Sequence, residues 1–107
     1  MRFVLMALAD DGDPAALDGY ERELVRAGVL LAAEALEPAD AGACLRFEGE
    51  ERILSRIPSG HQPTAGDVTG IWMLQTAGED EALEWARRLP LTRGTVEVRR
   101  VAGDAGR

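Results

Sequence analysis

The sequence predicts an α+β domain in which one antiparallel sheet carries two helices on a single face. Two segments with helical periodicity, 14–27 and 79–89, alternate with short apolar segments that are typical of strands. The 107 residues suffice for one domain, over 1–103 with a short tail at 104–107. Because 46% of the residues are apolar, the chain is expected to fold around one core.

The first half of the chain is predicted to form a strand, a helix and a second strand. Residues 3–8 are apolar throughout and stop at a cluster of aspartates, as a buried central strand does. Asp13 and Pro14 then begin the helix, because the carboxylate caps free N–H groups and proline fits the first turn. Gly28 ends it, since glycine readily takes the left-handed conformation after a last turn. Residues 29–35 resume as a strand.

A β-hairpin is predicted next, from residues 43–47 and 52–57, with Gly49 in its turn. The segment 58–67 holds two prolines and two glycines, and long irregular loops of this kind often carry function. Residues 68–75 follow as another strand, in which a glycine indicates a bulge or a close approach.

The second helix is marked by its charges. Residues 79–81 are all acidic, and Arg87 and Arg88 occupy the last turn, so both ends complement the helix dipole. Pro90 ends this helix. Residues 95–101 begin with apolar and polar side chains in alternation and form the last predicted strand.

This order of elements predicts two βαβ-like halves that close into a ferredoxin-like antiparallel sheet. Both helices then lie on one face, and the chain has no third helix for the other. An apolar sheet face without cover implies a partner. The simplest partner is a second copy, so we expect a homodimer with facing sheets.

Charge and cysteine content exclude several classes of function. The net charge is −7 and no basic cluster is present, which disfavours binding to nucleic acid or to an anionic membrane. No segment is long and apolar enough to span a bilayer, and the N-terminal apolar run is too short for a signal peptide. Cys44 is the one cysteine and is expected to be a small buried residue at the start of a strand. We expect a cytoplasmic protein.

Three residues are candidates for catalysis. Glu34 is a carboxylate inside an apolar strand, either buried as a general acid or base, or exposed and paired with an arginine such as Arg46. His61 is the only histidine and lies in the irregular loop, as a proton carrier or as a solvated surface group. Asp67 precedes a strand and can equally close the loop through a backbone hydrogen bond.

Three further residues are candidates for ligand binding, namely Tyr20, Arg46 and Trp72. Tyr20 and Trp72 fall at positions that suit the core equally well. Arg46 can bind an anion but is also typical of a solvated hairpin. One histidine without a cysteine partner gives no metal site, and we expect no cofactor.

Several segments together resemble the YCII-related proteins, specifically their DGPF-domain branch. Relatives share the order and spacing of these segments over nearly the whole chain: GYERELVRAGVLL at 19–31, AAEALEP at 32–38, GIWML at 70–74, and the regions 81–90 and 96–99. The resemblance implies a dimeric α+β barrel. It also implies a largely uncharacterised function, for which a His and an Asp in a cleft are proposed as an acid–base pair in related proteins.

The chain departs from that branch in its name-giving motif. The Asp-Gly-Pro-Phe motif should fall on residues 58–61, which read PSGH, and the usual Glu and Lys are replaced by Pro63 and Ala65. The helix-1 His of relatives corresponds to Glu21. The sequence therefore supports two functions: a small-molecule enzyme with carboxylate and histidine acid–base chemistry in a cleft near the dimer interface, or a non-catalytic module that binds a ligand or a protein in regulation.

Overall fold

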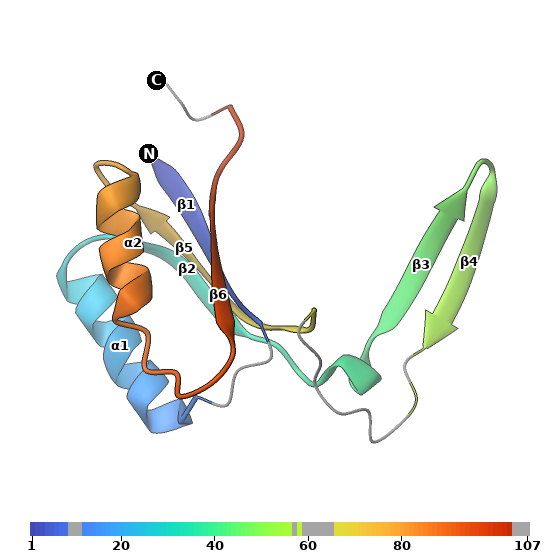
Figure 1. The fold of residues 1–107 in the computed structure, drawn as a ribbon, viewed down its shortest axis with the longest axis horizontal. Helices are drawn as coiled ribbons and strands as arrows, with labels where there is room; N and C mark the ends of the chain where they lie inside the picture. The colour runs from blue at the N-terminus through green and yellow to red at the C-terminus, as the bar shows by residue number, and fades with distance from the viewer. Residues whose placement is uncertain (9–11, 57, 59–65, 104–107) are drawn as a thin grey trace.

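The computed structural model describes residues 1–8, 12–56, 58 and 66–103, and its elements follow the expected order (Figure 1). They are β1 (Arg2–Leu8), α1 (Pro14–Arg26), β2 (Leu30–Ala35), a short 3-10 helix η1 (Ala39–Ala41), β3 (Ala43–Glu48), β4 (Glu51–Arg56), β5 (Val68–Gln75), α2 (Glu79–Arg87) and β6 (Thr95–Arg100). Each predicted helix and strand is present, with ends that shift by one or two residues.

Four strands form one antiparallel sheet in the order β2-β5-β1-β6. Both helices lie on one face of this sheet (Figure 1). The first and third connections of the sheet carry α1 and α2, and the arrangement is that of a ferredoxin-like fold. The predicted fold class is therefore confirmed.

Local signals in the sequence act as expected at the ends of these elements. The Asp13 carboxylate accepts a hydrogen bond from the Ala16 N–H at 3.3 Å and so caps α1. Gly28, which follows that helix, has φ of 73°, and Gly49 in the hairpin turn has φ of 58°. Both angles lie in the left-handed region that favours glycine.

The core lies between the sheet and the helices. On β1 and β5 the side chains alternate, so that every second residue is buried against the helices. The buried apolar residues are Phe3, Leu5, Ala7, Tyr20, Leu24, Val29, Trp72, Leu74, Ala82 and Leu89. The other sheet face, which we call the open face, has Val4, Met6, Ile71 and Met73 at its centre, all only partly buried.

The β3–β4 hairpin is separate from this domain. It forms its own two-stranded sheet and stands on the side of the open face, away from the helices (Figure 1). Its projection gives the molecule a radius of gyration of 15.7 Å, against about 13 Å for a compact chain of this length. All six residues of β3 are exposed.

The position of Cys44 corrects one expectation. This residue was expected to be buried at the start of a strand, and it does begin β3 next to Ala43, but it is exposed. The reason is that the hairpin has no second layer against which its side chains can pack.

Candidate functional site

A pocket of about 260 Å³ lies between the start of α1 and the corner of the sheet where β2 ends and β5 begins. We call it the α1 pocket. Helix α1 and the residues before it form one wall, and the sheet forms the other. The lining residues are Gly12, Pro14, Leu17, Asp18 and Glu21 on the first wall and Ala35, Thr69, Gly70 and Trp72 on the second.

Two carboxylates stand at this pocket, on the helical wall. Asp18 and Glu21 are three residues apart in α1 and therefore project from the same side of the helix. Asp18 is exposed and Glu21 is partly buried. Neither carboxylate forms an ion pair within the described part of the chain, so both are available to a ligand.

Trp72 forms part of the opposite wall and is 4% exposed. Its indole Nε1–H is buried and has no hydrogen-bond acceptor among the residues that the structure describes. A buried polar group without a partner costs about 1–3 kcal/mol, so such groups are uncommon in native proteins. The Trp72 indole is therefore the chemically unusual group of this wall.

Gly70 makes room for that indole. A Cβ atom at position 70 would lie 3.2 Å from Cη2 of Trp72, which is closer than ordinary van der Waals contact. The sequence interpretation of a bulge or a close approach is confirmed on both counts. The register between β1 and β5 shifts next to Gly70, leaving Thr69 as an extra residue, and the Thr69 hydroxyl donates to the Ala7 carbonyl at 3.2 Å.

Tyr20 lies beside the pocket but is part of the core. Its hydroxyl donates to the Trp85 carbonyl at 2.7 Å and so connects α1 to α2. Its ring meets Trp72 edge to face, with centroids 6.3 Å apart. Burial raises the pKa of Tyr20, while the nearby Arg88 lowers it and Glu23 raises it further. Tyr20 is thus placed as a neutral strut that supports the Trp72 wall.

The other predicted site residues lie elsewhere. Glu34 is exposed on the open face, opposite Ile71, whereas the next residue, Ala35, lines the α1 pocket. Adjacent residues of a strand point to opposite faces, so Glu34 and the pocket carboxylates are separated by the sheet. The structure does not form the alternative pair of Glu34 with Arg46: Glu34 lies on the four-stranded sheet, and Arg46 lies on the separate hairpin, where it pairs with Glu48 at 3.0 Å.

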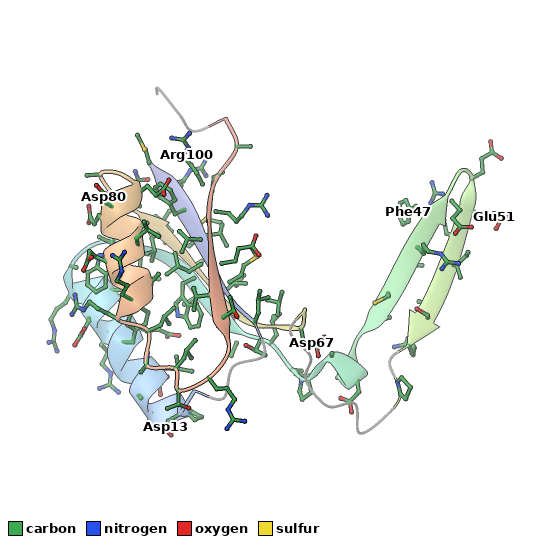
Figure 2. All side chains as sticks on the ribbon, viewed as in Figure 1. Asp13, Phe47, Glu51, Asp67, Asp80 and Arg100 are labelled. Atoms are coloured by element: carbon green, nitrogen blue, oxygen red, sulfur yellow. The ribbon has the colours of Figure 1, made fainter. Side chains whose placement is uncertain are left out.

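Asp67 and His61 were predicted to share a cleft with Glu34. Asp67 is partly buried where the chain returns from the hairpin to the sheet (Figure 2), and it lines a neighbouring hollow together with Leu36 and Glu37. His61 lies outside the described residues. Of the predicted residues, Trp72 is the one that the structure places on the wall of the α1 pocket.

The sequence interpretation missed Asp18 and did not propose Glu21 as a site residue. Two signals could have identified them. One was the spacing of two carboxylates by three residues beside the apolar stripe of a predicted helix. The other was that Glu21 takes the position of the histidine in helix 1 of relatives.

Within the described ranges, no cluster of three histidine, cysteine or acidic residues is placed to hold a metal ion. The same part of the chain contains no helix that is both long enough and apolar enough to cross a membrane.

Comparison with known proteins agrees with this fold. The model of the YCII-related domain matches residues 1–103, which is nearly the whole chain, and the protein belongs to that family. A search of curated proteins found no match to this chain.

Proposed function

We propose that the α1 pocket of this YCII-related domain binds a small organic molecule. The observation that carries the proposal is the Trp72 side chain, which lines a pocket wall and whose buried N–H has no acceptor among the described residues. A shift of the indole on binding would bring this N–H to a carbonyl, ether or hydroxyl oxygen of a ligand. Ligand pockets typically combine apolar walls with a few polar groups of this kind.

The carboxylates restrict the class of ligand. Asp18 and Glu21 are without cationic partners in the described part of the chain, and no arginine lines the α1 pocket. An anionic ligand would be repelled by two carboxylates, whereas a protonated amine or a hydroxyl donor would be attracted. The proposed ligand therefore has an apolar body, a hydrogen-bond acceptor for Trp72 and a cationic or donor group for the carboxylates.

Fluorescence of Trp72 provides the test. The chain has two tryptophans, so Trp85→Phe leaves Trp72 as the single reporter. A library of small amines, alcohols and carboxylic acids is titrated into this variant. We expect saturable changes with amines or hydroxyl compounds, weaker binding in Glu21→Gln, and unchanged binding in the control Glu50→Gln, which alters the hairpin turn. Preference for carboxylic acids, or equal binding by both variants, would contradict the proposal.

A catalytic role is the second candidate, and the paired carboxylates favour it. Two carboxylates one turn apart on a pocket can divide the tasks of proton donor and acceptor once a ligand excludes water. Glu34, His61 and Asp67 remain the candidates for acid–base work that the sequence suggested. Turnover of any bound compound, lost in Glu21→Gln even when the compound is saturating, would favour the enzyme over the binding module.

We also propose that the working unit is a homodimer joined through the open face. Val4, Met6, Ile71 and Met73 form the apolar centre of that face, and no described element covers it. Burial of an exposed apolar surface of this kind drives association. Sedimentation at tens of micromolar should give the mass of two chains, and a single-chain mass there would contradict the dimer.

A further inference from the structure

The β3–β4 hairpin has one apolar face without cover. Leu45 lies directly opposite Leu54, and Phe47 lies opposite Arg52, so these four side chains share a face. Leu45, Phe47 and Leu54 are 59%, 66% and 58% exposed. Figure 2 shows Phe47 near the tip of the hairpin, far from the helices.

A two-stranded hairpin without a packed layer has little to stabilise it. Two-stranded hairpins are marginally stable in water and require a third strand or a packed layer to persist. Here the strands pair with each other alone, and neither joins the four-stranded sheet. The apolar face therefore requires an external surface.

The charges on this face indicate what that surface is. Arg52 and Arg56 accompany the apolar side chains, and no carboxylate lies on the same face, because Glu48 and Glu51 point to the other one. The complementary surface is therefore apolar with acidic groups around it. This chain has a net charge of −7, and its open face offers such a surface at the β2 edge, where Glu34 borders the apolar centre. At the β6 edge of the same face, Glu97 is paired with Arg99 at 3.1 Å.

The position of the hairpin agrees with the same occupant. It stands on the open-face side of the sheet (Figure 1), so a second copy seated on the open face would lie next to it. In a two-fold dimer, each hairpin would reach the other copy at the same time, and both apolar faces would be covered in one event.

We infer that the β3–β4 hairpin is a dimerisation arm whose apolar face packs against a second copy of this chain. The inference rests on the proposed open-face dimer and adds to it a second contact, made by residues outside the four-stranded sheet. It assigns the exposed Leu45, Phe47 and Leu54 to an interface between two copies.

Adjacent substitutions on β4 test the arm. Leu54 and Ser55 are both exposed and point to opposite faces of the hairpin, so Leu54→Asp and Ser55→Asp add the same charge in the same strand. We expect Leu54→Asp to weaken the dimer at least tenfold in sedimentation equilibrium and Ser55→Asp to leave it unchanged. Circular dichroism should show that both variants remain folded, because neither side chain is in the core.

A third variant separates the arm from the sheet contact. Met6→Asp places a charge at the centre of the open face and tests the underlying dimer. If Met6→Asp abolishes the dimer while Leu54→Asp dimerises as well as the wild type, the arm contact is contradicted and the open-face dimer stands. A wild-type chain that stays single at tens of micromolar would overturn both.

Hydrogen exchange gives an independent readout on the unmodified protein. If the arm docks on a second copy, the amides of β3 and β4 become protected over the same range of protein concentration in which dimers form. Protection that does not change with concentration would contradict the inference. The amides of β1, which are paired on both sides within one copy, serve as the internal reference.

Discussion

Strands β1 and β3 show how the same kind of element can have opposite environments. Both are paired antiparallel strands, yet on β1 Phe3, Leu5 and Ala7 are 2%, 0% and 0% exposed, whereas every residue of β3 is exposed. The difference lies in what covers each strand. Two helices cover one face of β1, and no described element of the same chain covers β3 (Figure 1). Alternating apolar side chains thus identify a surface to be buried without specifying what buries it.

Matched leucine truncations test this contrast with the largest expected effect. Leu5→Ala leaves a cavity in the core and should lower the free energy of unfolding by about 2–5 kcal/mol. Leu54→Ala, in the hairpin, should lower it by less than about 1 kcal/mol when the protein is dilute enough to be a single copy. Urea unfolding followed by circular dichroism measures both. Equal losses in dilute protein would mean that the hairpin is part of the main core.

Gly70→Ala tests how tightly the main domain is packed at the α1 pocket. The new Cβ would stand 3.2 Å from the Trp72 ring and 3.5 Å from the Glu34 carbonyl, so the indole must move. Overpacking of this kind typically costs about 1–3 kcal/mol. A shifted emission maximum in the Trp85→Phe background should accompany the loss. Gly66→Ala, where an added Cβ meets no atom of the described residues within 4 Å, is the matched control.

Tyr20→Phe tests the strut between the helices. Loss of the hydrogen bond to the Trp85 carbonyl should lower the free energy of unfolding by about 0.5–1.5 kcal/mol at neutral pH. Because burial raises the pKa of Tyr20, the folded chain holds this proton more tightly than the unfolded chain. Stability from this group is therefore complete below about pH 10, the pKa of an unfolded tyrosine, and falls as the pH rises further.

The alkaline range is favourable for measuring that fall. The chain contains one tyrosine and no lysine, so few other groups titrate there. Stability of the wild type should decline more steeply above about pH 10 than stability of Tyr20→Phe. Tyrosinate absorbance should appear together with unfolding. If Tyr20 ionises at its ordinary pKa while the chain remains folded, its proposed role as a buried, neutral link between α1 and α2 would be contradicted.

Surface ion pairs are expected to contribute little to the free energy of unfolding, both in the main domain and in the hairpin. Glu23 and Arg88 join α1 to the end of α2 at 2.7 Å, and Glu48 and Arg46 pair on the hairpin at 3.0 Å. All four side chains are at least half exposed. Glu23→Gln and Glu48→Gln should each cost about 0–1 kcal/mol, measured by urea unfolding in low and high salt. A larger loss for Glu23→Gln would show that this pair does more than bridge two helices in water.

The fold could be predicted from sequence because its signals are local. The Asp13 cap, Gly28 after α1 and Gly49 in the hairpin turn each act within a few residues. The exposure of Cys44 could not be predicted in this way. It depends on whether the β3–β4 hairpin joins the sheet, and pairing between distant strands leaves no mark in the hairpin's own residues.

The candidate site was predicted only in part for a similar reason. Trp72 is a ligand-binding candidate at a position that suits the core equally well, and the structure shows both, since its buried side chain lines the α1 pocket. Glu34 was chosen because its strand is otherwise apolar, but strand alternation places it on the opposite face from its neighbour Ala35. A bulge near Thr69 and the approach of α1 determine which residues meet at this corner, and both are properties of the assembled sheet.

The central position of β1 has a consequence for the order in which the domain assembles. β1 is hydrogen-bonded to β5 and β6, which come late in the sequence, whereas β3 and β4 are joined by two residues. Closing a short loop is fast, so the hairpin can form before β1 has paired with β5 and β6. During synthesis, we therefore expect β1 to keep one edge without a partner until residues 95–100 have emerged, so that its backbone is open to chaperones or to pairing with other chains.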